Sequence, residues 1–228
     1  PMKARRTGFT LLELLMVLGV LGVLMGMMIP SVGIVREKAQ RMVTGNKLRQ
    51  VGLAVATYHS MTGRSLTGDS LAEWAVRLAG QTGLAESEVF LFNDDPLFQT
   101  FTGTVPPVLL ERSGSGDGEP VTGFAEFPIG LAVASGVDPY APPATTPIAW
   151  TRGLTSSGRW LGQGSSRAGV YGDEGGFIVF LDGHVRFYRD LAEDGGQLVA
   201  HDSSGRTGDI QEALGPGVQA YDFVGRVF

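Results

Sequence analysis

The residues with the clearest chemical potential lie at the start of the chain. Glu13 is the one charged residue in an apolar stretch that runs from Phe9 to Ile29. A carboxylate costs about 2.5–3.5 kcal/mol at the centre of a membrane helix and less near its end, so it needs a partner. Glu13 is therefore a functional candidate. Gly8 separates the stretch from three basic residues, which are Lys3, Arg5 and Arg6.

A second group of acidic residues could bind a metal ion. Asp173 and Glu174 lie in a glycine-rich segment just before an expected strand, and Asp182 lies just after it. Hard cations prefer several oxygen ligands from carboxylates and tight loops. The three residues are calcium candidates, and ordinary turn residues are the alternative.

Patterns typical of catalysis are missing from the sequence. The three histidines, His59, His184 and His201, are scattered and form no H-E-x-x-H site. The sequence also lacks a G-x-S-x-G elbow and a P-loop, and it contains no cysteine for a disulfide or a thiolate metal site. We therefore expect no enzyme and no cofactor other than a possible calcium ion.

The apolar stretch is long enough for a membrane helix. Its 21 residues would extend about 32 Å as a helix, against a hydrocarbon core of about 30 Å. A secretory signal peptide also begins with a basic segment before an apolar run. However, Met27-Met28-Ile29-Pro30-Ser31 offers no A-x-A-like cleavage site.

The segment Gly8-Phe9-Thr10-Leu11-Leu12-Glu13-Leu14 resembles the class III signal of type IV prepilins and pseudopilins, and the resemblance extends through Pro30. It implies that a prepilin peptidase cleaves after Gly8 and N-methylates Phe9. It also implies that Glu13 faces the Phe9 amine of a neighbouring subunit, where each charge neutralises the other.

The same resemblance implies partners and a location. The partners are copies of the chain and other pilin-like subunits, the peptidase, an inner-membrane assembly platform and the lipid bilayer before assembly. The leader would be cytoplasmic and the head periplasmic, with the filament periplasmic or extracellular. A pilus and a type II secretion pseudopilus both remain open. The absence of a terminal cysteine pair favours the pseudopilus. The alternative class is a membrane-anchored extracytoplasmic binding protein or enzyme.

Small residues in the stretch could bring helices together. Gly19, Gly22 and Gly26 lie on one helical face, and Gly22-x-x-x-Gly26 allows close approach in lipid. Glycine is also simply frequent in membrane helices. Together with Pro30, these glycines predict that the helix bends or melts between 19 and 30 during assembly.

After Pro30 the pattern becomes amphipathic, and a helix is predicted to continue to about residue 62, with Lys47 among the basic residues on its polar faces. Residues 1–49 carry eight basic and two acidic residues, a net charge of +6, whereas residues 50–228 carry a net charge of −11. An acidic body argues against nucleic-acid binding.

The expected organisation is a leader (1–8), a membrane or filament-core helix (9–30), an amphipathic helix (31–62) and a head (63–228). The fold class is α+β, a long helix packed on an antiparallel sheet. Within the head the sequence predicts the following elements: a helix capped by Ser70 and ending near Gly80, strands at 89–92, 129–134 and 148–150, a hairpin at 177–188 with a two-residue type I′ turn at Asp182-Gly183, and a helical turn capped by Asp209.

Overall fold

The computed structural model describes residues 9–112 and 118–228, and at residues 27–32, 34, 111, 112 and 118 it describes the backbone alone. The chain divides into two compact units, Pro1–Met42 and Val43–Phe228. The second unit, here called the head, contains the strands and the buried core of the described chain.

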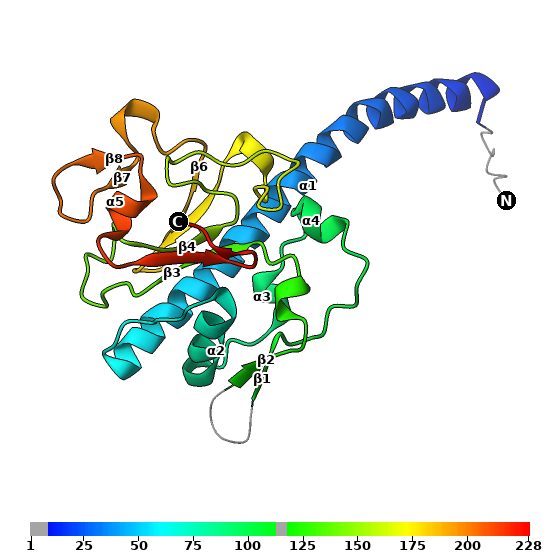
Figure 1. The fold of residues 1–228 in the computed structure, drawn as a ribbon. Helices are drawn as coiled ribbons and strands as arrows, with labels where there is room; N and C mark the ends of the chain where they lie inside the picture. The colour runs from blue at the N-terminus through cyan, green and yellow to red at the C-terminus, as the bar shows by residue number, and fades with distance from the viewer. Residues whose placement is uncertain (1–8, 113–117) are drawn as a thin grey trace, which may run out of the picture. The chain divides into compact units, whose positions relative to one another are not determined.

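Helix α1 (Leu11–Thr62) contributes residues to both units and is assigned without interruption through Pro30. Within the head, Leu48, Val51 and Val55 are almost completely buried and recur at helical spacing. This stripe packs the second half of α1 into the core of the head (Figure 1). The prediction of a long helix packed on an antiparallel sheet is confirmed.

Gly52 lets α1 approach strand β5 (Gly176–Phe180) and the turn after it closely. A β-carbon at Gly52 would lie 2.6 Å from Val179 Cγ2 and 3.2 Å from Gly183 Cα. Seven residues earlier, a β-carbon at Gly45 would lie 3.7 Å from the ring of Phe177, which is ordinary contact. The glycines that weaken α1 as an isolated helix therefore belong to its packing surface.

The main sheet has six strands in the order β10-β9-β3-β4-β5-β6, and every neighbouring pair is antiparallel. Strands β3 and β4 are buried at all five positions, so they show no alternation of apolar and polar residues. The predicted strands near 129–134 and 148–150 are confirmed in this sheet. The other strands have the bounds β3 (Leu131–Ser135), β4 (Pro147–Thr151), β6 (Val185–Tyr188), β9 (Gln219–Asp222) and β10 (Gly225–Arg226).

Helix α2 (Leu71–Thr82) begins as predicted. The Glu73 backbone N–H donates to Ser70 Oγ at 3.1 Å, and Glu73 Oε2 accepts from the Asp69 N–H at 2.9 Å. The helix ends at Thr82, two residues after Gly80 and so near the predicted end, and its C-cap Gly83 has a φ of 77° in the left-handed region.

The strand predicted at 89–92 is wrong. Ser87–Phe90 forms a single helical turn, α3, and Leu91 and Phe92 follow it as an irregular buried segment. An apolar run of four residues has no period that separates a helix from a strand. Val89, Phe90 and the two residues after them are buried in the core, so these apolar side chains leave water without forming a strand.

The hairpin of β5 and β6 is confirmed, but its turn differs from the prediction. The last pair is Phe180 and His184, where the Phe180 N–H donates to His184 O at 3.0 Å. The loop therefore has three residues. Its last residue, Gly183, has a φ of 83°, whereas Asp182 does not have the positive φ that a type I′ turn requires.

The burial of Lys47 corrects the expectation that it lies on a polar face. The residue is only 6% exposed. Its Nζ donates to Leu91 O at 3.1 Å and lies 3.9 Å from Glu88 Oε1. Desolvation lowers the pKa of Lys47, and the nearby Glu88 and Asp94 carboxylates partly offset this effect.

The remaining elements are short. The predicted turn capped by Asp209 is confirmed as α5 (Ile210–Leu214), where the Gln211 N–H donates to Asp209 Oδ1 at 2.8 Å. Strands β9 and β10 were not predicted. The other elements are α4 (Pro96–Gln99), the paired strands β1 (Leu110–Arg112) and β2 (Gly118–Pro120), the paired strands β7 (Leu198–Val199) and β8 (Arg206–Thr207), and the 3-10 turns η1 (Phe124–Glu126), η2 (Gly172–Glu174) and η3 (Glu193–Gly195).

Candidate processing and assembly site

The predicted cleavage site lies at the edge of the described chain. Gly8 and the basic leader before it lie outside the described residues. Phe9 is the first described residue, two positions before the start of α1, and it is 79% exposed. The predictions of cleavage after Gly8 and of methylation at Phe9 stay predictions.

Glu13 makes a reciprocal cap with Thr10 at the start of α1. Glu13 Oε2 accepts from the Thr10 N–H and from Thr10 Oγ, each at 2.9 Å, and the Glu13 N–H donates to Thr10 Oγ at 3.2 Å. This is a capping box, which satisfies backbone donors that the first helical turn leaves free. The Thr10-Leu11-Leu12-Glu13 pattern carries this signal in the sequence, but the cap was not predicted.

The capping box leaves half of the carboxylate available. Both bonds from Thr10 go to Oε2, and within the described residues Oε1 accepts no hydrogen bond. Glu13 therefore has a structural role within its own chain and a free oxygen that can accept from another donor. The predicted pairing with the Phe9 amine of a neighbouring subunit stays a prediction.

The first part of α1 is apolar and uncovered in the N-terminal unit. The large apolar side chains described from Phe9 to Met25 are between 43% and 81% exposed, with Leu21 the least and Leu11 the most exposed. They lie at successive positions and so surround the helix. Within residues 9–112 and 118–228, no helix is both long and apolar enough to cross a membrane. The predicted membrane span is therefore not confirmed.

The glycine face of α1 is open. A β-carbon at Gly19, Gly22 or Gly26 would have no atom within 4 Å, apart from its own chain neighbours and helix backbone. Pro30 lies within the helix assignment and has no backbone N–H to donate. The predicted roles of Gly22, Gly26 and Pro30 in assembly need a second copy of the chain, and they stay predictions.

The three calcium candidates do not come together. Asp173 and Glu174 lie in η2, before β5, and Asp182 lies in the turn after β5. A five-residue strand spans about 17 Å, which is far longer than a coordination shell. Within the described residues, no three His, Asp or Glu side chains gather where they could hold a metal ion.

Asp182 has a different role, with His184. Asp182 Oδ1 lies 2.6 Å from His184 Nδ1 and also accepts the His184 backbone N–H at 2.9 Å. The imidazole stacks on the ring of Phe180 at a centroid distance of 4.2 Å. These contacts order the hairpin turn.

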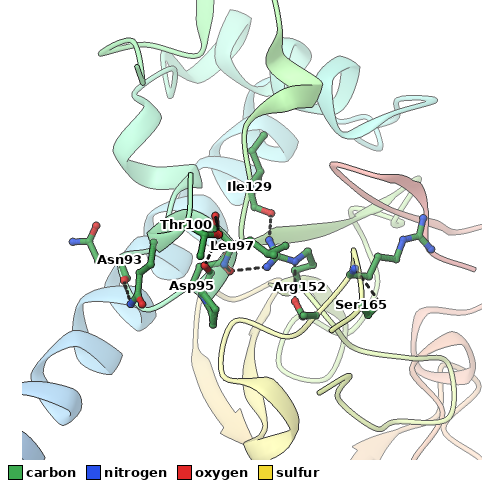
Figure 2. Close-up of polar contacts among 11 residues, drawn as sticks. Asn93, Asp95, Leu97, Thr100, Ile129, Arg152 and Ser165 are labelled. Carbon is green, nitrogen blue, oxygen red and sulfur yellow. Dashed lines mark hydrogen bonds and ion pairs between the residues drawn. The ribbon is translucent and has the colours of Figure 1, made fainter. Parts of the chain in front are cut away.

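A buried ion pair that was not predicted from the sequence joins distant segments of the head. Arg152, at the end of β4, and Asp95, before α4, are both fully buried, and Arg152 Nη2 lies 2.7 Å from Asp95 Oδ1. Arg152 also donates to Ile129 O and Ala168 O, each at 2.9 Å (Figure 2). Asp95 Oδ1 accepts the Leu97 N–H at 3.0 Å as the cap of α4. The pair and its hydrogen bonds connect four segments of the head, around residues 95, 129, 152 and 168.

The comparison with protein families supports the interpretation of the N-terminal segment. Residues 3–29 match the family model described as the prokaryotic N-terminal methylation motif. The chain carries the class III signal of type IV pilins and pseudopilins. This motif indicates a pilin-like or pseudopilin precursor. No curated protein and no solved structure matches the chain.

Proposed function

We propose that the chain is a structural subunit of a type IV pilus-like filament or of a type II secretion pseudopilus. One observation carries the proposal: the class III signal leads directly into a helix whose apolar side chains are exposed at every described position from Leu14 to Leu18. A helix that is apolar on all sides must be covered by lipid or by other helices. A filament subunit has both coverings in turn.

Lipid would cover the apolar part of α1 before assembly, and other helices would cover it in the filament. Before assembly the bilayer would cover the apolar part of α1, with the head on the periplasmic side. In the filament the same surface would pack against α1 of other copies, and the open face of Gly22 and Gly26 would allow the helices to approach closely. A prepilin peptidase and an inner-membrane assembly platform would carry out the processing and the transfer.

Glu13 would decide the axial register of this packing. Cleavage after Gly8 creates an amine at Phe9, and Glu13 Oε1 is free to accept from the amine of a neighbouring subunit. A carboxylate in lipid costs about 2.5–3.5 kcal/mol at the helix centre and less near its end. An ion pair removes part of that cost only when the two helices dock at the correct height.

The capping box makes a sharp test possible, because the charge and the cap can be removed separately. Glu13→Gln removes the charge and keeps an amide oxygen that can accept from Thr10. Thr10→Val removes the hydroxyl of the cap and keeps the charge. We expect Glu13→Gln to be processed normally and to be missing from purified filaments. We expect Thr10→Val to be processed and incorporated, because a lost cap costs only about 1 kcal/mol.

The opposite pattern would contradict the proposed role of the charge. If Glu13→Gln enters filaments as well as the wild type and Thr10→Val does not, the carboxylate acts only as a helix cap. If neither variant changes incorporation, Glu13 does not specify assembly. A chain that keeps its leader and works as a tethered single copy would instead be an anchored binding protein or enzyme.

A further inference from the structure

A hollow of about 400 Å³ lies in the head at the C-terminal end of α1. One wall of the hollow is the end of α1, and the opposite wall is the loop at residues 139–143. Hydrogen bonds hold this loop in place. The Asp182 N–H donates to Pro143 O at 3.0 Å, and Thr146 Oγ donates to Pro142 O at 2.9 Å. We call this site the α1-end hollow. Its lining residues are Ala56, His59, Ser60, Gly63, Pro139, Tyr140, Ala141, Pro143 and Leu181.

Electron-rich groups line the α1-end hollow or lie next to its lining residues. Tyr140 is a lining residue and is 84% exposed. Asp138, which directly precedes the lining residue Pro139, is exposed and accepts the Tyr140 N–H on Oδ1 at 2.9 Å, and within the described residues its other oxygen accepts no hydrogen bond. Ser60 and Gly63 in the wall mark the end of α1, where the helix dipole is negative. Aromatic faces, carboxylates and helix C-termini all favour a positive charge.

His59 in the wall is a buried polar group without a partner. The side chain is only 8% exposed, and neither ring nitrogen has a hydrogen-bond partner within the described residues. Its ring meets the Tyr58 ring edge-on at 6.1 Å. Burial lowers the pKa of His59 and so favours the neutral imidazole, and Asp138 offsets this only in part. A neutral imidazole does not repel a cation.

The rest of the wall is apolar, with small and ring-shaped side chains from three segments (Ala56, Pro139, Ala141, Pro143 and Leu181). A small inorganic cation makes no favourable contact with apolar side chains. A lysine or arginine side chain does, because its aliphatic stem covers apolar surface while its charged end stays near polar groups.

We propose that the α1-end hollow binds a lysine or arginine side chain of α1 from another copy of the chain. The inference rests on the proposed function, because a filament places many copies side by side. Charge complementarity favours this occupant. Residues 50–228 carry a net charge of −11, whereas the segment from Arg36 to Arg49 holds five basic residues and one glutamate. Arg36 and Lys38 are exposed in that segment.

The first test measures the chemistry of the site on the full chain in detergent. N-acetyl-arginine amide is the probe, and the readout is the NMR titration of the three histidine rings. We expect a saturable shift at His59 alone and a further fall in its pKa when the probe is bound. N-acetyl-citrulline amide, which has the same shape without the charge, should give neither effect. Equal shifts with both probes, or no saturable shift, would overturn the proposal.

Variants show whether the named groups make the site. Tyr140→Leu and Asp138→Asn should each weaken probe binding by about 2- to 5-fold. Asp202→Asn, a matched exposed carboxylate at another hollow, should leave binding unchanged. Equal affinity in all three variants would remove the basis for the site. Stronger binding after Arg64→Gln would show that Arg64 of the same chain is the occupant, which would also overturn the proposal.

The second test identifies the source of the side chain. Because the chain has no cysteine, Ser60→Cys and Glu37→Cys each introduce a single thiol and keep Arg36 and Lys38. Cells expressing both variants should give mixed dimers with a short bismaleimide, whereas Ser204→Cys with Glu37→Cys should not. Absence of the first dimer would overturn the assignment to another copy. If the probe binds while the chain stays unprocessed, the proposed function fails and the site chemistry stands.

Discussion

Replacing Gly52 with alanine would test how closely α1 approaches the sheet of the head. The new methyl group would lie 2.6 Å from Val179 Cγ2 and 3.2 Å from Gly183 Cα. Val179 is fully buried and β-branched, and Gly183 presents backbone. Neither neighbour can move aside cheaply.

The size of the effect follows from two opposing terms. Overpacking a core costs about 1–3 kcal/mol, and alanine improves an exposed helix over glycine by about 1 kcal/mol. For Gly52→Ala the difference is a net loss of up to about 2 kcal/mol. For Gly45→Ala the nearest atom is 3.7 Å away, so only the helix gain remains, about 0.5–1 kcal/mol. The two variants should therefore shift the free energy of unfolding in opposite directions.

Tryptophan fluorescence during urea unfolding of the full chain in mild detergent measures this difference. The three tryptophans, Trp74, Trp150 and Trp160, are all buried in the head. The signal therefore reports the head and not the first part of α1. If Gly52→Ala stabilises the head as much as Gly45→Ala does, α1 does not lie against the hairpin turn as described.

Two further predictions use the same unfolding assay. Asp95→Ala should destabilise the head by about 3–5 kcal/mol, because it leaves the Arg152 cation buried without its counter-ion; a loss no larger than that of an exposed pair would contradict the burial. Burial lowers the pKa of His59, so the unfolded chain, whose histidine pKa is about 6.5, takes up the proton first. His59 therefore adds no pH dependence well above pH 7 and lowers stability progressively as the pH falls below about 6.5. His59→Leu should flatten this slope, and an unchanged slope would refute the assignment.

Local signals in the sequence identified many elements of the fold. Ser70 and Asp209 predicted helix starts because a cap depends on residues within one turn. The hairpin at 177–188 was predicted from two apolar runs around Asp182-Gly183, but its loop length depends on strand register, which the runs alone do not fix. The strands β9 and β10 were missed because short strands in glycine-rich sequence give little pattern.

Long-range contacts could not be read from the sequence. Arg152 and Asp95 are 57 positions apart, and nothing near either residue indicates the other. Lys47 follows the basic pattern of its segment, yet the turn at Leu91 buries it. The candidate site, in contrast, could be predicted from the sequence, because the class III signal is local and lies within seven residues. The cap between Thr10 and Glu13 was equally local.

Mass spectrometry of the mature amino terminus tests the central claim most directly. The chain should be purified from cells that process other class III precursors. We predict that its first residue is Phe9 and that this residue carries one added methyl group on its α-nitrogen. A mature chain that still contains Lys3 to Gly8, or that begins at an unmodified residue elsewhere, would contradict the assignment to a pilin-like subunit.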